Sequence, residues 1–313
     1  MKITKNEIIS IAKKLGFDLI GFTKYQKLLN EVDNLKKWLN NGYHAKMEYM
    51  QKNLDKKEDP HLILPDCKVV VSLGMNYYQE IEYKQNKAKI SKYALGKDYH
   101  YVMWKKLQIF VDELKLMEKN LSYYYNVDTG PVLDKAWAVK AGLGWLGKNS
   151  NLINPKKGSF FFLATVFLNI EIDFDEQIIT DHCGNCTRCI DACPTQAIVE
   201  SYVVDSNKCI SYLTIENKED ISLEFIGKFE SWAFGCDICQ DVCPWNNKFS
   251  VPTQEKRFLE HLIEPNIEFD YFDKYTNSQF KQRFKFSPIT RAKLKGLIRN
   301  LNFIRVSNQM KKN

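Results

Sequence analysis

The sequence lacks any long hydrophobic run. Its longest apolar stretch, residues 160–168, is far shorter than the roughly 20 residues that a membrane-spanning helix needs. The N-terminus has no apolar segment of the kind that forms the core of a signal peptide, and it carries no twin-arginine signal. We therefore expect a cytoplasmic protein that does not associate with membranes.

Acidic residues are absent from the end of the chain. Residues 274–313 contain 11 Lys or Arg and no Asp or Glu, whereas the rest of the sequence has 34 basic and 38 acidic residues. The whole positive excess behind the net charge of +7 therefore lies in this segment. Such a basic segment favours a polyanionic partner, of which nucleic acid is the usual one. The alternative is a charged terminus that only improves solubility.

Cysteine is nearly absent outside one region, since eight of the nine cysteines fall between residues 183 and 243. Cys67 is the exception, and because it has no partner at a useful spacing we interpret it as a buried structural thiol. In a cytoplasmic chain, clustered cysteines indicate metal or redox chemistry more than disulfides.

The first group of cysteines has a distinctive spacing. Cys183, Cys186, Cys189 and Cys193 follow the pattern C-x2-C-x2-C-x3-C, and Pro194 comes next. This is the run with which bacterial ferredoxins hold a 4Fe-4S cluster, and its fourth cysteine serves a second cluster. The spacing therefore predicts two clusters and a second run.

The second run is present in split form. Cys236, Cys239 and Cys243 give C-x2-C-x3-C before Pro244, and Cys209 lies upstream of an insertion, residues 210–235. Zinc sites use paired C-x2-C units with four ligands each, which does not explain both runs. Crossed ligation predicts one cluster on Cys183, Cys186, Cys189 and Cys243, and another on Cys193, Cys209, Cys236 and Cys239.

Residues 1–175 alternate between helical and strand patterns. Helical spacing of apolar residues covers residues 3–15, 107–117 and 133–143, and buried-strand patterns cover residues 68–75 and 160–168. We expect an α+β protein with three parts. These are an N-terminal α/β domain (1–175), a ferredoxin-like two-cluster domain (176–250) and a basic helical segment (251–313).

A glycine-rich stretch, residues 142–149, matches G-x-G-x-x-G and nearly matches a P-loop. Both motifs require a preceding strand and a following helix, but the preceding residues 136–141 have a helical pattern, and Asn149 replaces the hydroxyl residue that would bind magnesium. We therefore do not expect a nucleotide here, and we expect the glycines to let the backbone approach some other cofactor.

Several segments resemble the epoxyqueuosine reductase family. Residues 91–100, SKYALGKDYH, are similar to the R-Y-A-x-G-x-D-Y-H segment of these enzymes. Residues 128–137, 141–149, 152–155 and 158–161 continue the resemblance, as does the split cysteine run, so it extends over nearly the whole chain. Many members continue into a C-terminal helical-repeat domain, and this sequence stops near residues 291–300.

The resemblance implies a cobalamin-dependent oxidoreductase related to reductive dehalogenases, with a nitroreductase-like N-terminal domain. Such an enzyme removes the epoxide oxygen of epoxyqueuosine at the tRNA wobble position to give queuosine. Its cobalamin has the nucleotide base detached from cobalt, and an external low-potential donor supplies electrons through two 4Fe-4S clusters. We expect a monomer.

The resemblance also implies site residues. Asp134 stands where the family has its proton donor, and burial would raise its pKa, although capping a helix is the alternative role. Cobalamin contacts are expected at Lys57, Tyr93, Lys97, His100, Asp134, Ser159, Ser211 and Asp241. Phosphate contacts to tRNA are expected at Lys281, Arg283, Lys285, Arg291, Lys293, Lys295 and Arg299. Phe280, Phe284 and Phe286 interleave with these cations, and most of them are expected in the core.

Two other functions fit parts of the sequence. A two-cluster electron carrier without its own substrate would explain the cysteines and would bind no cobalamin. A cobalamin-dependent reductive dehalogenase would explain the scaffold, but such enzymes are typically exported, and the basic C-terminal segment would have no purpose in one.

Overall fold

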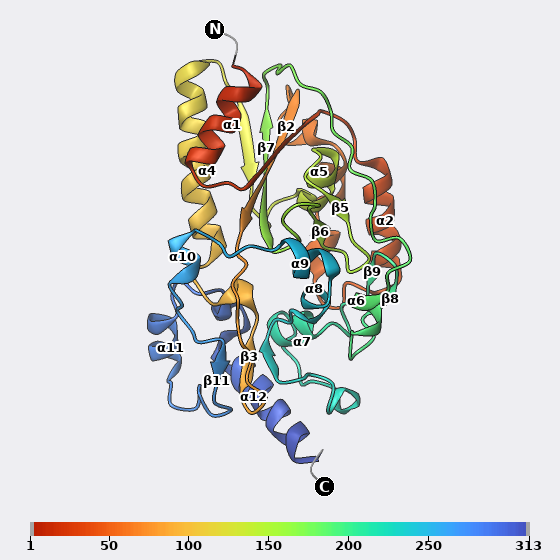
Figure 1. Cartoon of the computed structure of the whole chain (residues 1–313), viewed down its shortest axis with the longest axis vertical. Coiled ribbons are helices and arrows are strands. Elements are labelled where there is room, and N and C mark those ends of the chain that lie inside the picture. The colour runs from red at the N-terminus through yellow and green to blue at the C-terminus, as the bar shows by residue number, and fades with distance from the viewer. Residues whose placement is uncertain (1–2, 311–313) are drawn as a thin grey trace.

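The computed structural model describes residues 3–310, and its N-terminal half is built on a four-stranded antiparallel sheet (Figure 1). Each strand pairs with its neighbour over nearly its whole length. In sheet order the strands are β1 (Leu19–Lys24), β2 (Val69–Asn76), β7 (Phe161–Leu168) and β4 (Tyr123–Asn126).

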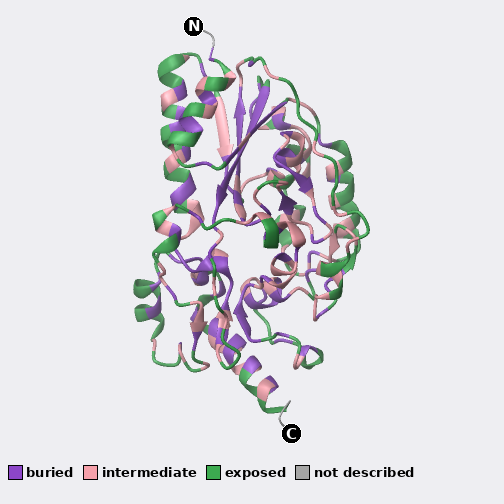
Figure 2. Ribbon diagram, viewed as in Figure 1, coloured by how far each residue is buried: buried purple, intermediate pink, exposed green. Residues whose placement is uncertain are grey.

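Both faces of this sheet are covered, which is why β2 is buried along its whole length. Val71 and Val166 face α1 (Lys5–Lys14) and α4 (Tyr99–Met117) in the largest core cluster. The alternate residues face α5 (Asp134–Lys140), whose Trp137 packs on Phe167. Figure 2 shows these strands as a buried layer between partly exposed helices. The elements α2 (Leu29–Asn40) and α3 (Leu54–Glu58) lie outside α5.

A second, smaller sheet joins distant parts of the chain. Its central strand β3 (Ala88–Ile90) pairs with β10 (Trp232–Phe234) on one side and with β11 (Asn266–Ile267) on the other. The core around it includes residues 88–95, 210–234 and 263–304. Three helices contribute to this core: α7 (Ile210–Ile215), α11 (Asn277–Arg283) and α12 (Lys293–Met310).

The cysteine-rich segment contains only short elements, as expected of a region that metal sites shape more than an apolar core does. It lies between the two sheets in Figure 1. Its elements are α6 (Arg188–Asp191), β8 (Ile198–Glu200), β9 (Val203–Val204), α8 (Ile238–Asp241) and α9 (Pro244–Phe249), and α10 (Lys256–Leu259) follows.

The helices and strands predicted for the N-terminal half are confirmed, and so is the α+β class. The predicted helices and strands correspond to α1, α4, α5, β2 and β7, although α4 begins eight residues earlier than predicted, at Tyr99. Cys67 is buried, as expected. The division into three parts stays a prediction. Among residues 3–310, no helix combines the length and apolar character needed to cross a membrane.

The glycine-rich stretch lies in a helix-to-strand connection and, as predicted, does not have the context of a nucleotide-binding motif. It follows α5 and continues into β5 (Trp145–Leu146), which pairs with β6 (Leu152–Ile153), so neither nucleotide-binding motif has its required context. A Cβ at Gly144 would lie 2.1 Å from the Ile153 carbonyl oxygen, and one at Gly142 would lie 2.6 Å from that of Gln177. Gly142 and Gly144 therefore permit close approach of protein backbone, and the expected approach of this stretch to a cofactor stays a prediction.

Candidate redox centres and active site

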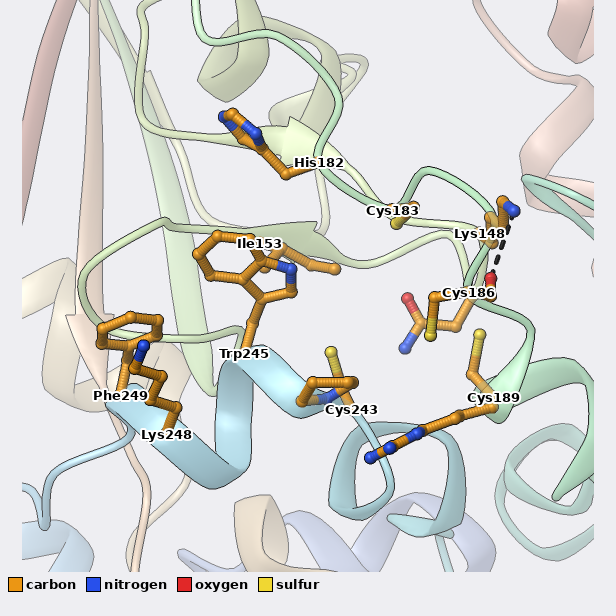
Figure 3. Close-up of a pocket in the computed structure, with 13 residues that line it drawn as sticks. Lys148, Ile153, His182, Cys183, Cys186, Cys189, Cys243, Trp245, Lys248 and Phe249 are labelled. Atoms are coloured by element: carbon orange, nitrogen blue, oxygen red, sulfur yellow. Dashed lines mark hydrogen bonds between the residues drawn. The ribbon is translucent and has the colours of Figure 1, made fainter.

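Four cysteines surround a cavity of about 350 Å³. Cys183 and Cys186 come from the loop that leads into α6, Cys189 lies within α6, and Cys243 precedes the first turn of α9. In Figure 3 these four side chains point toward a common space. Other lining residues are Lys148, Asn149, Ile153, His182, Arg188, Pro244, Trp245, Lys248 and Phe249.

The other four cysteines form a second set, and each of them is partly exposed. Burial raises the pKa of the Cys239 thiol, and the nearby Cys209, Cys189 and Cys193 raise it further. Burial also raises the pKa of Cys236, where Cys239 and Cys209 add to the effect. The structure thus brings together the same two sets of four cysteines that crossed ligation predicts. Cys189 belongs to the first set and affects Cys239, so the two sets adjoin.

The arrangement does not suit a single metal ion. Within residues 3–310, no three His, Cys, Asp or Glu side chains lie close enough together to share one ion. A zinc site needs four ligand atoms at about 2.0–2.3 Å from one centre. Cysteines spread around a cavity suit a larger cluster of several metal atoms, as the ferredoxin spacing predicts.

The loop after α5 holds both cysteine sets in place, a role that sequence reasoning missed. The Trp145 indole N–H donates to the Cys183 sulfur over 3.4 Å. Lys148 Nζ donates to the carbonyl oxygens of Gly184 (2.6 Å) and Cys186 (3.1 Å). The Asn149 side chain donates to the Cys239 carbonyl oxygen over 3.1 Å, so a single loop contacts both sets.

Asp134, the first residue of α5, lies over two polar positions of the main sheet. Thr165 on β7 is the register partner of Asn126 on β4, so both side chains leave the same face of the sheet. Thr165 Oγ1 donates to Asp134 Oδ1 over 2.6 Å, and Asn126 Nδ2 donates to Oδ2 over 2.9 Å. The backbone N–H of Asp128 donates to the same carboxyl group. The carboxyl is therefore held in one orientation.

Burial raises the pKa of Asp134 to about 7, and the negative charge of Asp128 adds to the rise. The hydrogen bonds from Thr165 and Asn126 oppose the rise without cancelling it. A carboxyl group with this pKa carries a proton in about half of the molecules at neutral pH, so it can act as a general acid there.

Two polar side chains of α4 meet Asp128 next to Asp134. Tyr99 OH donates to Asp128 Oδ2 over 2.8 Å, and His100 Nε2 lies 3.6 Å from the same oxygen, an ion-pair distance longer than a hydrogen bond. Burial alone would lower the pKa of His100, but its contacts with Asp128 and Asp98 raise it to about 9. Asp128 itself has a left-handed backbone, with φ of 60°.

Lys135 follows Asp134 in the sequence and lies near cysteines of the second set. Its side chain is exposed and donates to the Ser150 carbonyl oxygen over 2.7 Å, yet desolvation lowers its pKa, which indicates a recessed position. Asp128, Cys239 and Cys209 partly offset that decrease. Lys135 is therefore near Cys239 and Cys209 of the second cysteine set, and it directly follows Asp134 in the sequence.

Three of the predicted cofactor residues, Tyr93, Lys97 and His100, come from the segment that ends in the first turn of α4. Burial raises the pKa of Tyr93 well above its usual value, and Asp128 and Asp98 add to the rise, which places the ring near His100. Lys97 Nζ lies 4.9 Å from the centre of the Phe286 ring. Tyr93 and His100 thus share Asp98 and Asp128 as neighbouring carboxylates, and their contacts with cobalamin stay a prediction.

The remaining predicted cofactor residues have partners within the protein. Lys57 is buried, and its Nζ donates to the carbonyl oxygens of Met50 and Lys52. Ser159 Oγ accepts hydrogen bonds from the side chains of Gln240 and Asn246.

Ser211 and Asp241 lie beside the second cysteine set. The Ser211 hydroxyl hydrogen-bonds the Cys209 sulfur. Asp241 Oδ1 accepts from the buried Lys92 over 2.7 Å. Lys92 also lies 3.6 Å from Asp237, which stands between Cys236 and Cys239 in the sequence. The sequence analysis did not identify Lys92 or Asp237 as neighbours of the clusters.

The seven predicted tRNA-contacting cations differ in their surroundings. Arg299 donates to the backbone carbonyls of Leu213 and Asn217, so it holds α7 and the following loop. Arg291 forms a two-bond ion pair with Glu216 at 2.7 and 2.9 Å. The others are exposed: Lys281, Arg283, Lys285, Lys293 and Lys295. Phe280 and Phe284 are in the core, as expected, but Phe286 is 41% exposed.

Known proteins resemble this chain over nearly its whole length. Residues 182–246 match the family model of the 4Fe-4S double cluster binding domain, and residues 57–129 match that of epoxyqueuosine reductase QueG, DUF1730. The epoxyqueuosine reductase of Cellulophaga algicola is 48% identical over 297 residues, which cover 94% of this chain and 95% of the relative. That of Pseudomonas aeruginosa is 38% identical, covering 92% and 81%.

Solved structures of epoxyqueuosine reductases also resemble this chain. An epoxyqueuosine reductase crystallised with an epoxyqueuosine-modified tRNA-Tyr stem loop superposes with a TM-score of 0.86 at 31% identity, covering 96% of this chain and 80% of that one. The enzyme from Streptococcus thermophilus gives 0.86 at 30% identity, covering 98% and 83%. On these similarities, the chain belongs to the epoxyqueuosine reductase family of oxidoreductases.

Proposed function

We propose that this protein removes the epoxide oxygen of epoxyqueuosine at the wobble position of a tRNA, giving queuosine. The observation that carries the proposal is Asp134, a carboxyl group with a pKa of about 7, and the residue that follows it, Lys135, is near the second cysteine set. The relative solved with an epoxyqueuosine-modified stem loop supports the choice of substrate. A tRNA substrate in turn supports the expected cytoplasmic location.

Removing an epoxide oxygen reductively requires two electrons and two protons. Both C–O bonds break, a carbon–carbon double bond forms, and the oxygen leaves as water. The two predicted 4Fe-4S clusters can pass the electrons singly. Asp134 can give one proton to the oxygen, and Thr165 and Asn126 hold its carboxyl in place for that transfer.

We further propose that base-off cobalamin binds in the recess beside Asp134. Cobalamin supplies a strong low-potential reductant for opening the epoxide. The residues fit a cofactor with many amide arms, because the recess offers polar atoms that such arms can contact. His100 Nε2 is buried without a hydrogen-bond partner among the described residues, and the exposed Lys135 is strongly desolvated. Tyr93, Lys97 and His100 are the contacts that the surroundings of Asp134 support best.

Electrons enter, in this proposal, at the cavity shown in Figure 3. Three of its four cysteines are partly exposed, and two cysteines of the second set are close to Lys135, the residue that follows the acid. Arg188 and Lys248 are exposed at the cavity, and no acidic side chain lines it. This charge pattern suits an acidic, low-potential donor protein.

The exposed cations of the C-terminal segment are proposed to contact the tRNA backbone. Lys281, Arg283, Lys285, Lys293 and Lys295 are all available for phosphate contacts. Arg291 and Arg299 are engaged with Glu216 and with backbone carbonyls, so we expect smaller effects on RNA binding from their substitution.

The test is anaerobic reconstitution with iron, sulfide and cobalamin, followed by assay on tRNA that bears epoxyqueuosine. We expect bound corrinoid absorbance and conversion of the nucleoside with loss of one oxygen atom, measured by mass spectrometry. A protein that assembles both clusters but binds no corrinoid and leaves the nucleoside unchanged would instead be an electron carrier. Iron-free protein that binds zinc would exclude the reductase altogether.

A further inference from the structure

Three large aromatic side chains gather on the surface near the start of α4. Tyr101 is 48% exposed, Trp104 is 39% exposed and Phe286 is 41% exposed. The Tyr101 ring meets the Phe286 ring edge-on with centroids 5.5 Å apart, and the Trp104 ring with centroids 6.4 Å apart. Clustered exposed aromatics of this kind mark a binding surface more often than scattered ones do.

The backbone holds this aromatic face together. Asp98 caps α4 through its side chain, and its own backbone N–H donates to the Phe286 carbonyl oxygen over 2.7 Å. Phe286 is therefore tied to the helix that carries the other two rings. Its neighbours Phe280 and Phe284 fill the core, so the stability of this segment does not depend on the exposed ring.

Cations flank the aromatic face. Lys97 Nζ lies 4.9 Å and Lys285 Nζ lies 5.2 Å from the centre of the Phe286 ring. Neither lysine forms an ion pair within residues 3–310. Two carboxylates of this region, Asp98 and Asp128, are paired with His100. The surface therefore combines ring faces with uncompensated positive charge.

The aromatic face adjoins the candidate active site. The His100 ring lies 5.3 Å from the Trp104 ring, and His100 contacts Asp128, whose backbone N–H binds the Asp134 carboxyl group. A molecule that reaches Asp134 with its reacting group therefore has its neighbouring parts within reach of the aromatic face.

A single-stranded nucleic acid loop is the partner that this chemistry fits. Unpaired bases stack on aromatic side chains, and lysines beside the rings neutralise the phosphates between those bases. We propose that Tyr101, Trp104 and Phe286 form a stacking surface for unpaired anticodon-loop bases that flank the wobble nucleotide. This inference rests on the proposed function, because it requires a tRNA substrate.

The test compares Trp104→Ala, Phe286→Ala and the double variant with wild type. Leu116→Ala is the matched control, since Leu116 is 85% exposed at the other end of the same helix. The probe is an epoxyqueuosine-bearing anticodon stem loop that carries 2-aminopurine next to the wobble nucleotide. Two quantities are measured on the cluster-loaded proteins: the dissociation constant, and the quenching of 2-aminopurine fluorescence that stacking causes.

We expect each alanine substitution to weaken binding by about tenfold, the order of what one stacked base contributes. The double variant should also lose the quenching of 2-aminopurine. A protein with the single substitution Trp104→Phe should keep the quenching, because phenylalanine can still stack. Leu116→Ala should behave as wild type. A double variant with wild-type affinity and quenching would refute the stacking surface and leave the proposed function unaffected. So would variants that bind RNA normally but lose corrinoid. Wild-type protein that fails to bind the stem loop would refute the proposed substrate as well.

Discussion

Replacing Asp134 with asparagine separates its catalytic role from its structural one. The substitution keeps the shape of the side chain and removes the proton that we propose it donates. A positioned general acid contributes roughly 10²–10⁴-fold to rate, so we expect Asp134→Asn to lower turnover by at least about 100-fold. Cluster content and affinity for the RNA stem loop should stay at wild-type values, because Asp134 contacts neither set of cysteines nor the basic segment.

The same substitution should change stability in a pH-dependent way. The pKa of Asp134 is raised from 3.8 to about 7 in the folded protein. Between these values the folded state keeps a proton that the unfolded state releases, so wild-type stability falls as pH rises through this window. The full difference corresponds to about 4 kcal/mol above pH 7. Asparagine avoids this penalty but points an amide N–H at one of three donors, which costs on the order of 1–2 kcal/mol. We therefore expect Asp134→Asn to be more stable than wild type at pH 8, by about 2–3 kcal/mol, and not at pH 4.

Two assays test this reasoning. Single-turnover conversion of epoxyqueuosine RNA, followed by nucleoside mass spectrometry, gives the rate from pH 5 to pH 9, and anaerobic urea unfolding gives the stability. Wild-type activity should fall above about pH 7 as Asp134 loses its proton. Thr165→Val removes a hydrogen bond that lowers the pKa of Asp134, so it should move this fall to higher pH. Near-normal turnover in Asp134→Asn, or a rate that does not respond to pH in wild type, would refute the role of this carboxyl group.

Three further predictions concern the clusters and their surroundings. Cys243→Ala should remove one cluster and keep the other, so that bound iron falls to about half by chemical analysis; complete loss of iron would contradict two separate cysteine sets. Charge reversal at Arg188 and Lys248 should slow cluster reduction by an acidic carrier protein at low salt, seen by stopped-flow absorbance, and leave reduction by dithionite unchanged. Lys92→Met leaves the buried Asp237 without its charged partner and should cost about 3–5 kcal/mol in urea unfolding, so wild-type stability in this variant would show that the pair is dispensable.

The cysteine sets could be predicted from the sequence because their information is local. The cysteines from Cys183 to Cys193 lie close together in the sequence, and crossed ligation follows from the ferredoxin pattern. The central strands β2 and β7 could also be predicted, since helices cover both faces of the sheet and leave nearly continuous apolar runs. The strands of the smaller sheet, β3, β10 and β11, were not predicted, because two or three residues carry no recognisable period.

The surroundings of Asp134 could not be predicted, because they depend on strand register. Asn126 and Thr165 meet only because β4 pairs with β7 in one particular alignment, which no local pattern specifies. The start of α4 was missed for a related reason. Its first turns expose Tyr101 and Trp104 toward solvent, which breaks the apolar spacing that identifies a helix. Asp98 as an N-cap was the available signal.

The position of β3 has a consequence for how the protein is made. This strand is synthesised early, yet both of its neighbours, β10 and β11, come from the last third of the chain. The ribosome must therefore release about 140 more residues before β3 gains its first partner at Trp232. Until then Ala88 and Ile90 have no core to enter, so a nascent chain is open to aggregation or to chaperones at this point. Shortened versions of the protein that end before residue 267 should for the same reason be difficult to obtain in folded form.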